Sequence, residues 1–267
     1  MFYPPTDELV RTDAPVRRRV GHELEFHSSN GESYPVDAMR VLQMDGVATP
    51  PLVNVVNDAH DGIHQYRCRC SLRDDYPLHP TSDATVEWII GGSRGVMFGS
   101  DRYYEAVDIL CRYAHLHDFG PFDTFGPGGH VHVSTSNPQA AITQVVRGYR
   151  RFGSEITRLA RGDLTAVRPY QNGVDYTGLV RAKPYGTIEF RQWNGSRIPE
   201  TIHVSAAVSV GIIEAVEADR QPNEYTSLLD WISPYLNTRM QTAVEARLAP
   251  SWRPRSPLTG RYMAVAA

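Results

Sequence analysis

The stretch Gly128-Gly129-His130-Val131-His132-Val133-Ser134 alternates histidine with valine directly after two glycines. On a β-strand, successive side chains point to opposite faces of the sheet, with a period of two residues. His130 and His132 would therefore share one face, and Val131 and Val133 would pack into a core on the other. The stretch predicts a β-strand with one polar face and one apolar face.

Two further segments repeat this alternation of ionisable and apolar residues, His22-Glu23-Leu24-Glu25-Phe26 and Thr187-Ile188-Glu189-Phe190-Arg191. Glu23 and Glu25 would share a face, as would Glu189 and Arg191. Any half-buried strand shows such alternation, but three strands with paired ionisable residues favour a functional site. Three carboxylates, two imidazoles and a guanidinium gain little stability from burial, yet they are well suited to hold metal ions and an anion.

The composition describes an ordinary folded protein of one domain, or at most two. The 267 residues are 41% hydrophobic and 21% charged, and the net charge of −3 gives no reason to expect binding to nucleic acid or to an anionic membrane. No apolar run approaches the roughly 20 residues of a membrane span, and the first residues lack the pattern of a signal peptide. Three cysteines form no disulfide framework, so we expect a cytoplasmic protein.

Strands and helices follow one another without regular βα alternation, which predicts an α+β fold with a largely antiparallel sheet. We expect an N-terminal arm over residues 1–17, one catalytic domain over 18–248 and an irregular basic tail over 249–267. The predicted strands, besides that of His130, are Arg18–His27, Leu52–Val56, His64–Cys70, Val86–Ile90, Gly178–Arg181 and Thr187–Trp193. The predicted helices are Val36–Met44, Asp101–His117, a helix from Asn137-Pro138 to Gly162, Ile198–Glu217, Ser227–Leu236 and Thr238–Leu248.

The residue types on the polar face leave two kinds of metal chemistry open. Carboxylates suit Mg²⁺, which shares its oxygen ligands with water and substrate phosphates, and a phosphoryl-transfer site would use them in that way. The two histidines suit Mn²⁺, Zn²⁺ or Fe, as in a metal-dependent hydrolase or oxygenase. Carboxylates on several strands and the phosphate-binding chemistry of Arg191 favour the first reading. Lys183, the only lysine, is either a phosphate contact or a chance residue on a hairpin through residues 183–186.

Residues 128–134 resemble the Gly-x-His-x-His-x-Ser stretch of glutamine synthetases, and residues 187–199 resemble their Ile-Glu-x-Arg strand and the start of the following helix. The order of segments is still more similar to small amidoligases that are often encoded by phages and bacterial gene clusters. That family opens with Gly-x-Glu-x-Glu-Phe, here residues 21–26, and continues with a mid-chain strand bearing a glutamate, here Glu87. The resemblance spans about residues 19–215.

The resemblance implies a glutamine synthetase catalytic-domain-like fold, with a curved sheet and helices packed on one face. It implies a carboxylate–amine ligase that uses ATP and Mg²⁺, or Mn²⁺ in its place, and forms an acyl phosphate. The implied metal ligands are Glu23, Glu25, Glu87, His130 and Glu189. The implied catalytic residues are Glu189, His132 and Arg191, and the expected contacts to ATP or phosphate are Lys183, Arg191, Arg94, Ser93 and Ser134.

The expected partners are a small-molecule or peptide-like carboxylate and an amine. A modified nucleobase as substrate and a homo-oligomer are left open, and no membrane partner is expected. Two alternatives to the ligase remain: a metal-dependent hydrolase or oxygenase using His130, His132 and a carboxylate, and a non-catalytic binding protein on the same fold.

Overall fold

The computed structural model describes residues 18–28, 53–57, 85–90, 96–100, 103–104, 106–108, 110–111, 119–120, 128–160, 179–196 and 198–249. The predicted arm, all of the predicted tail except Ala249, the predicted helix at Val36–Met44 and the predicted strand at His64–Cys70 lie outside these residues, as do Ser93 and Arg94. The division into arm, domain and tail therefore stays a prediction.

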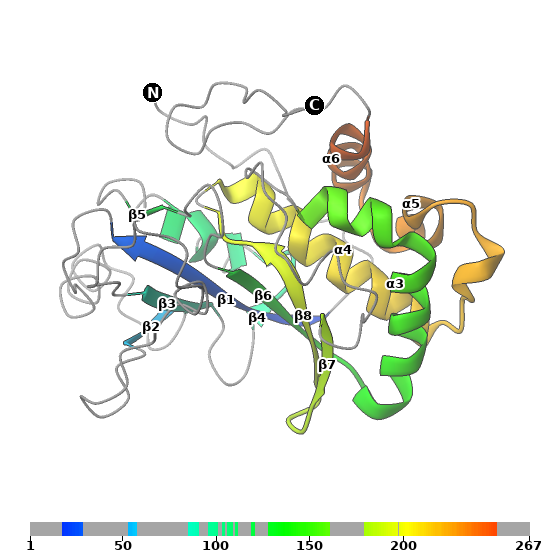
Figure 1. Ribbon diagram of the computed structural model, residues 1–267, viewed down its shortest axis with the longest axis horizontal. Coiled ribbons are helices and arrows are strands. Elements are labelled where there is room, and N and C mark those ends of the chain that lie inside the picture. The colour runs from blue at the N-terminus through cyan, green and yellow to red at the C-terminus, as the bar shows by residue number, and fades with distance from the viewer. Residues whose placement is uncertain are drawn as a thin grey trace, which may run out of the picture.

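The strands form one antiparallel sheet in the order β2-β3-β1-β6-β8-β7 (Figure 1). Their bounds are β1 Arg19–Ser28, β2 Val53–Asn57, β3 Thr85–Ile90, β6 Gly128–Ser134, β7 Val180–Lys183 and β8 Thr187–Asn194. Two short strands, β4 (Val96–Met97) and β5 (Phe119–Gly120), also pair with β1. The prediction of a mixed helix-and-sheet protein with an antiparallel sheet is confirmed for the described residues.

Four α-helices are described from end to end: α3 Pro138–Ala160, α4 Pro199–Glu217, α5 Leu228–Ile232 and α6 Thr238–Leu248. Helix α3 begins at Pro138 as predicted, and Asn137 caps it: the Asn137 side chain accepts a hydrogen bond of 3.1 Å from the backbone N–H of Ala140. The helical stretch predicted near residues 227–236 is present as two short helices. The stretch divides into α5 and the 3-10 helix η7 (Ser233–Tyr235), because Pro234 has no backbone N–H to continue the α-helix.

Two further stretches of the chain are helical. Residues 103–104, 106–108 and 110–111 are helical, and the N–H of Tyr103 donates to Ser100 Oγ at 3.2 Å. A 3-10 helix, η6 (Pro222–Glu224), follows α4. None of the helices in the described part of the chain is both long and apolar enough to cross a membrane.

Helices α3 and α4 pack against the apolar face of β6 and β8 (Figure 1). Val131, Val133, Ile188 and Phe190 supply that face, and all four are buried. Tyr149 of α3 packs with its ring centroid 6.2 Å from that of Phe190. The period-two prediction for β6 and β8 is thus confirmed: the apolar residues enter the core, and the ionisable ones are left on the opposite face.

A β-bulge interrupts the pairing of β6 with β8. Gly129 pairs with Trp193 and Val131 with Phe190, so that Arg191 and Gln192 together oppose His130. As a result Gln192 and Trp193 are both buried although they are consecutive, and the indole N–H of Trp193 donates to Ser209 of α4 at 3.1 Å. The bulge therefore anchors β8 to α4 next to the ionisable face.

Arg18 joins the start of β1 to the end of α4. Its guanidinium donates to Glu214, to Glu217 at 2.9 Å and to the carbonyl of Ser134 at 2.9 Å. Burial raises the pKa of Glu217, but hydrogen bonds from Arg18, Thr135 and Ser136 outweigh it and lower that pKa to about 2. This ionic contact fixes the ends of β1 and β6, the two central strands, relative to each other.

A buried histidine of the core is expected to make the folded protein less stable at acidic pH. His203 of α4 is buried between the rings of Tyr103 and Tyr104, and neither of its nitrogens has a hydrogen-bond partner among the described residues. Burial lowers its pKa from 6.5 to about 3, so the folded protein keeps it neutral. His22, also buried and with a pKa of about 3, packs against the same Tyr103.

The unfolded chain binds protons at His203 below pH 6.5 and the folded chain does not, so stability is complete above that pH and falls as the pH decreases toward 3. We expect the protonation of His203 in the unfolded chain to lower the free energy of unfolding by about 2 kcal/mol between pH 6.5 and 5, at ~1.4 kcal/mol per pH unit. Urea unfolding at pH 7 and pH 5 measures this loss. His203→Phe should make it smaller, and an equal loss in the wild type and the variant would contradict the assignment.

Candidate metal centre

Four ionisable residues meet where β1, β6 and β8 run side by side. Glu23 of β1 is the cross-strand partner of His130 of β6, and His132 is the partner of Glu189 of β8. Direct cross-strand neighbours have their Cβ atoms about 5 Å apart, close enough for these side chains to touch. The strand order therefore converts three separate sequence motifs into one cluster.

Glu23 contacts both histidines through its two carboxylate oxygens. Oε2 lies 2.8 Å from His130 Nδ1, in a hydrogen bond, and Oε1 lies 2.9 Å from His132 Nε2. Burial raises the pKa of Glu23, but the hydrogen bond with His130 and the charge of the nearby His132 imidazole outweigh burial and hold the pKa well below its usual range. Glu23 is therefore a carboxylate over the whole physiological pH range.

Glu189 is buried, with only 1% of its surface exposed, and basic groups surround it. Its Oε2 lies 2.9 Å from Lys183 Nζ and its Oε1 lies 3.2 Å from Arg191 Nη1. The same Oε1 is 3.7 Å from His130 Nδ1 and 3.9 Å from His132 Nε2. A buried carboxylate is costly without such partners, and Lys183 and Arg191 supply them at the centre of the cluster.

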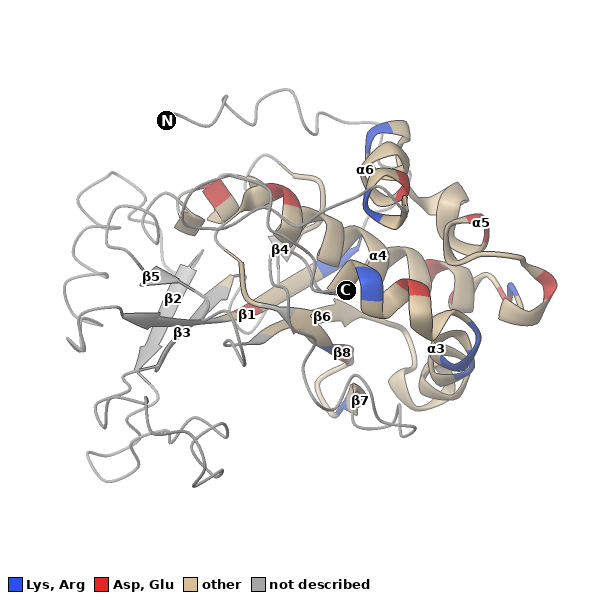
Figure 2. Cartoon of the chain, turned by 45° about the horizontal axis from the view of Figure 1, so that its top comes forward, with Lys and Arg blue, Asp and Glu red and all other residues tan. Residues whose placement is uncertain are grey.

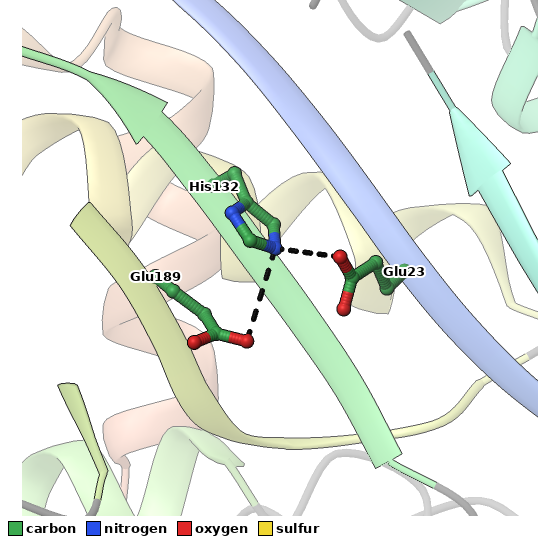
Figure 3. Close-up of side chains that lie close together, drawn as sticks. All are labelled: Glu23, His132 and Glu189. Carbon is green, nitrogen blue, oxygen red and sulfur yellow. Dashed lines mark ion pairs between the residues drawn. The ribbon is translucent and has the colours of Figure 1, made fainter. Parts of the chain in front are cut away.

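Glu23, His132 and Glu189 are arranged so that they could hold one metal ion (Figure 3). One ligand atom from each lies within 4.8 Å of the other two. His132 Nε2 is buried and makes no hydrogen bond of good geometry with any described residue, although both carboxylates are near it. An imidazole nitrogen between two carboxylates needs a proton or a cation there, and two oxygens with one nitrogen suit Mn²⁺, Zn²⁺ or Fe as well as Mg²⁺.

The structure gathers most of the predicted site residues that it describes. His130 is not part of the trio that could hold one ion, but it contacts Glu23, a member of that trio. Lys183 of β7 and Arg191 of β8 both contact Glu189. Blue segments on these two strands mark basic residues in Figure 2. Ser134 Oγ accepts a hydrogen bond from the backbone N–H of Arg19 at 3.2 Å, at the end of β6. The expected contacts of these residues with ATP stay predictions.

Two other predicted ligands are described only by their backbone. Glu25 of β1 and Glu87 of β3 are direct cross-strand partners. This register shows that the strand of Glu87 lies next to the strand of Glu23, an adjacency that the sequence alone did not predict. Their roles as metal ligands stay predictions.

Sequence reasoning missed one residue at the site, Tyr185. It lies in the turn between β7 and β8, and its Oη is 3.5 Å from His132 Nδ1. Its position in a hairpin turn was visible in the sequence, but its approach to His132 depends on the pairing of β8 with β6. The available signal was an aromatic residue two positions after the only lysine.

Comparisons with known proteins name no relative: no protein-family model matches the chain, and no curated protein matches its sequence.

Proposed function

We propose that this protein is an ATP-dependent carboxylate–amine ligase of the amidoligase kind, on a glutamine synthetase-like catalytic domain. One observation carries the proposal: a cluster of ionisable side chains from three strands. Its members are Glu23, His130, His132 and Glu189, and Lys183 and Arg191 form ion pairs with Glu189. Carboxylates and imidazoles for a divalent cation, next to basic groups for phosphate, are the parts that phosphoryl transfer requires.

The proposed reaction begins with transfer of the γ-phosphoryl group of ATP to a substrate carboxylate, which releases ADP. The resulting acyl phosphate is attacked by an amine, so that a C–N bond forms, the C–O bond to phosphate breaks and inorganic phosphate leaves with the proton lost from the amine. Mg²⁺ or Mn²⁺ would neutralise the charge of the phosphates. Glu23, Glu189 and an imidazole would hold the cation, and Arg191 would neutralise the phosphoryl group in transfer.

The adjacency of β3 and β1 supports extending this site to Glu25 and Glu87. Glutamates on neighbouring antiparallel strands supply the further oxygen ligands that a second hard cation needs. The proposal includes a cytoplasmic location and substrates that are small or peptide-like.

Hydroxylamine tests this proposal without knowledge of the natural amine. It attacks acyl phosphates, so the protein incubated with Mg-ATP, hydroxylamine and a panel of carboxylic acids should form a hydroxamate and ADP in equal amounts with one class of acid. The control variant Glu245→Gln, on the exposed face of α6, should form as much hydroxamate and ADP as the wild type. ADP without hydroxamate, or neither product with any class of acid, would contradict a ligase.

A metal-dependent hydrolase or oxygenase is the second candidate, favoured by one observation. The trio of Glu23, His132 and Glu189 contains an imidazole nitrogen, a ligand that Zn²⁺ and Fe accept more readily than Mg²⁺ does. For this candidate, Zn²⁺ or Fe²⁺ should stabilise the protein without nucleotide, and Mg-ADP should not.

A further inference from the structure

Tyr185 is placed where a structural role does not account for it. It is 63% exposed, and it is the one large apolar side chain of the described residues that is exposed to this degree. The turn that carries it is held by backbone hydrogen bonds, from Gly186 N–H to Lys183 O at 3.2 Å and from Thr135 N–H to Gly186 O at 3.0 Å. Its ring is therefore not needed to hold the hairpin together.

The phenol of Tyr185 reaches back to the metal centre. Its Oη lies 3.5 Å from His132 Nδ1, and the two rings are 6.1 Å apart at their centroids with an angle of 34°. The other nitrogen of the same imidazole, Nε2, faces Glu23 and Glu189 (Figure 3). The two nitrogens of His132 thus have separate neighbours: a hydroxyl for Nδ1 and two carboxylates for Nε2.

This division has a consequence for cation binding. A neutral imidazole carries one N–H and one lone pair, and only the lone pair can bind a metal ion. If Nε2 carried the proton, it would donate to the carboxylates and occupy the position of a cation. If Nδ1 carries the proton, Nε2 offers its lone pair beside Glu23 and Glu189, and the Nδ1–H needs an acceptor because His132 is buried.

We propose that Tyr185 is a positioning residue for the metal centre: its hydroxyl accepts the Nδ1–H of His132 and so favours the tautomer whose Nε2 binds the cation. The inference rests on the metal centre of the proposed function. Because Tyr185 is exposed, its own hydroxyl hydrogen remains free to bond with water or with a bound ligand.

Calorimetric titration of the intact chain with Mn²⁺ alone tests the inference. Tyr185→Phe removes only the hydroxyl, and Tyr185→Ala removes the ring as well. We expect both variants to bind Mn²⁺ about tenfold more weakly than the wild type, since loss of a partner that orients a metal-binding histidine typically costs 10- to 100-fold in affinity. Tyr225→Phe, the same chemical change beside Arg220, should bind as the wild type does.

Two readouts separate positioning from a merely structural role. The melting temperature of metal-free Tyr185→Phe should equal that of the wild type, and the nitrogen signal of histidine-bound Mn²⁺ in pulsed electron paramagnetic resonance should weaken in the variant. If Tyr185→Phe binds Mn²⁺ with wild-type affinity, the inference is overturned and the metal centre is not, whether or not Tyr185→Ala binds more weakly. Failure of the wild type to bind Mn²⁺ would overturn both the inference and the metal centre on which it rests.

Discussion

Replacement of Glu189 by glutamine is expected to reduce ADP formation in the hydroxylamine assay at least a hundredfold, a typical cost for losing one preorganised electrostatic group at the reacting centre. Among the residues that the structure describes, Glu189 is the one carboxylate within ion-pair distance of Lys183, Arg191 and both histidines. The amide has nearly the same shape but no charge, so the variant removes the ligand without opening a cavity.

The fold should survive this change. Lys183 and Arg191 have partly exposed side chains, and water can replace the lost carboxylate as their partner. We expect the melting temperature of metal-free Glu189→Gln to stay within a few degrees of the wild type. Glu245→Gln is the matched control, with full activity. Unchanged turnover in Glu189→Gln would remove this residue from the site.

Gly148→Ala is expected to destabilise the protein by about 2 kcal/mol or more, although alanine normally favours a helix by ~1 kcal/mol over glycine. A Cβ atom at Gly148 in α3 would lie 2.5 Å from Cη2 and Cζ3 of Trp231. Trp231 is completely buried, it packs against Phe152 at 5.6 Å between ring centroids, and its indole N–H donates to Arg220 O at 3.0 Å. The ring cannot withdraw without breaking these contacts.

Urea unfolding measures this loss, and two comparisons identify its cause. Gly186→Ala faces no atom within 4 Å, so it should cost only the strain of its positive φ of 86°, about 1 kcal/mol. In a Trp231→Leu background the clash is relieved, and Gly148→Ala should be neutral or stabilising. A Gly148→Ala protein as stable as the wild type would show that α3 and α5 do not pack as described.

The faces of the strands could be predicted from the sequence because alternation is local. Val131 and Val133 enter the core and His130 and His132 do not, as a period of two requires. The start of α3 was likewise predicted from the neighbouring residues Asn137 and Pro138.

The pairing of the strands could not be predicted in the same way, since strand order and register depend on contacts between residues distant in the chain. The sequence indicated that Glu23, His132 and Glu189 belong to ionisable faces, but only the order β1-β6-β8 brings them within reach of one ion. The bulge at Arg191 and Gln192, and the approach of Tyr185 to His132, follow from that pairing.

Thermal unfolding with Mg-ADP measures whether this cluster binds a divalent cation together with a nucleotide. A ligand that binds only the folded state adds about 2.7 kcal/mol at a concentration of 100 times its Kd. We predict a clear rise in the melting temperature of the wild type and of Glu245→Gln with Mg-ADP, and none in Glu189→Gln. A rise with Zn²⁺ or Fe²⁺ alone and none with Mg-ADP, or an equal rise in Glu189→Gln, would rule out a site for Mg²⁺ and nucleotide at this cluster.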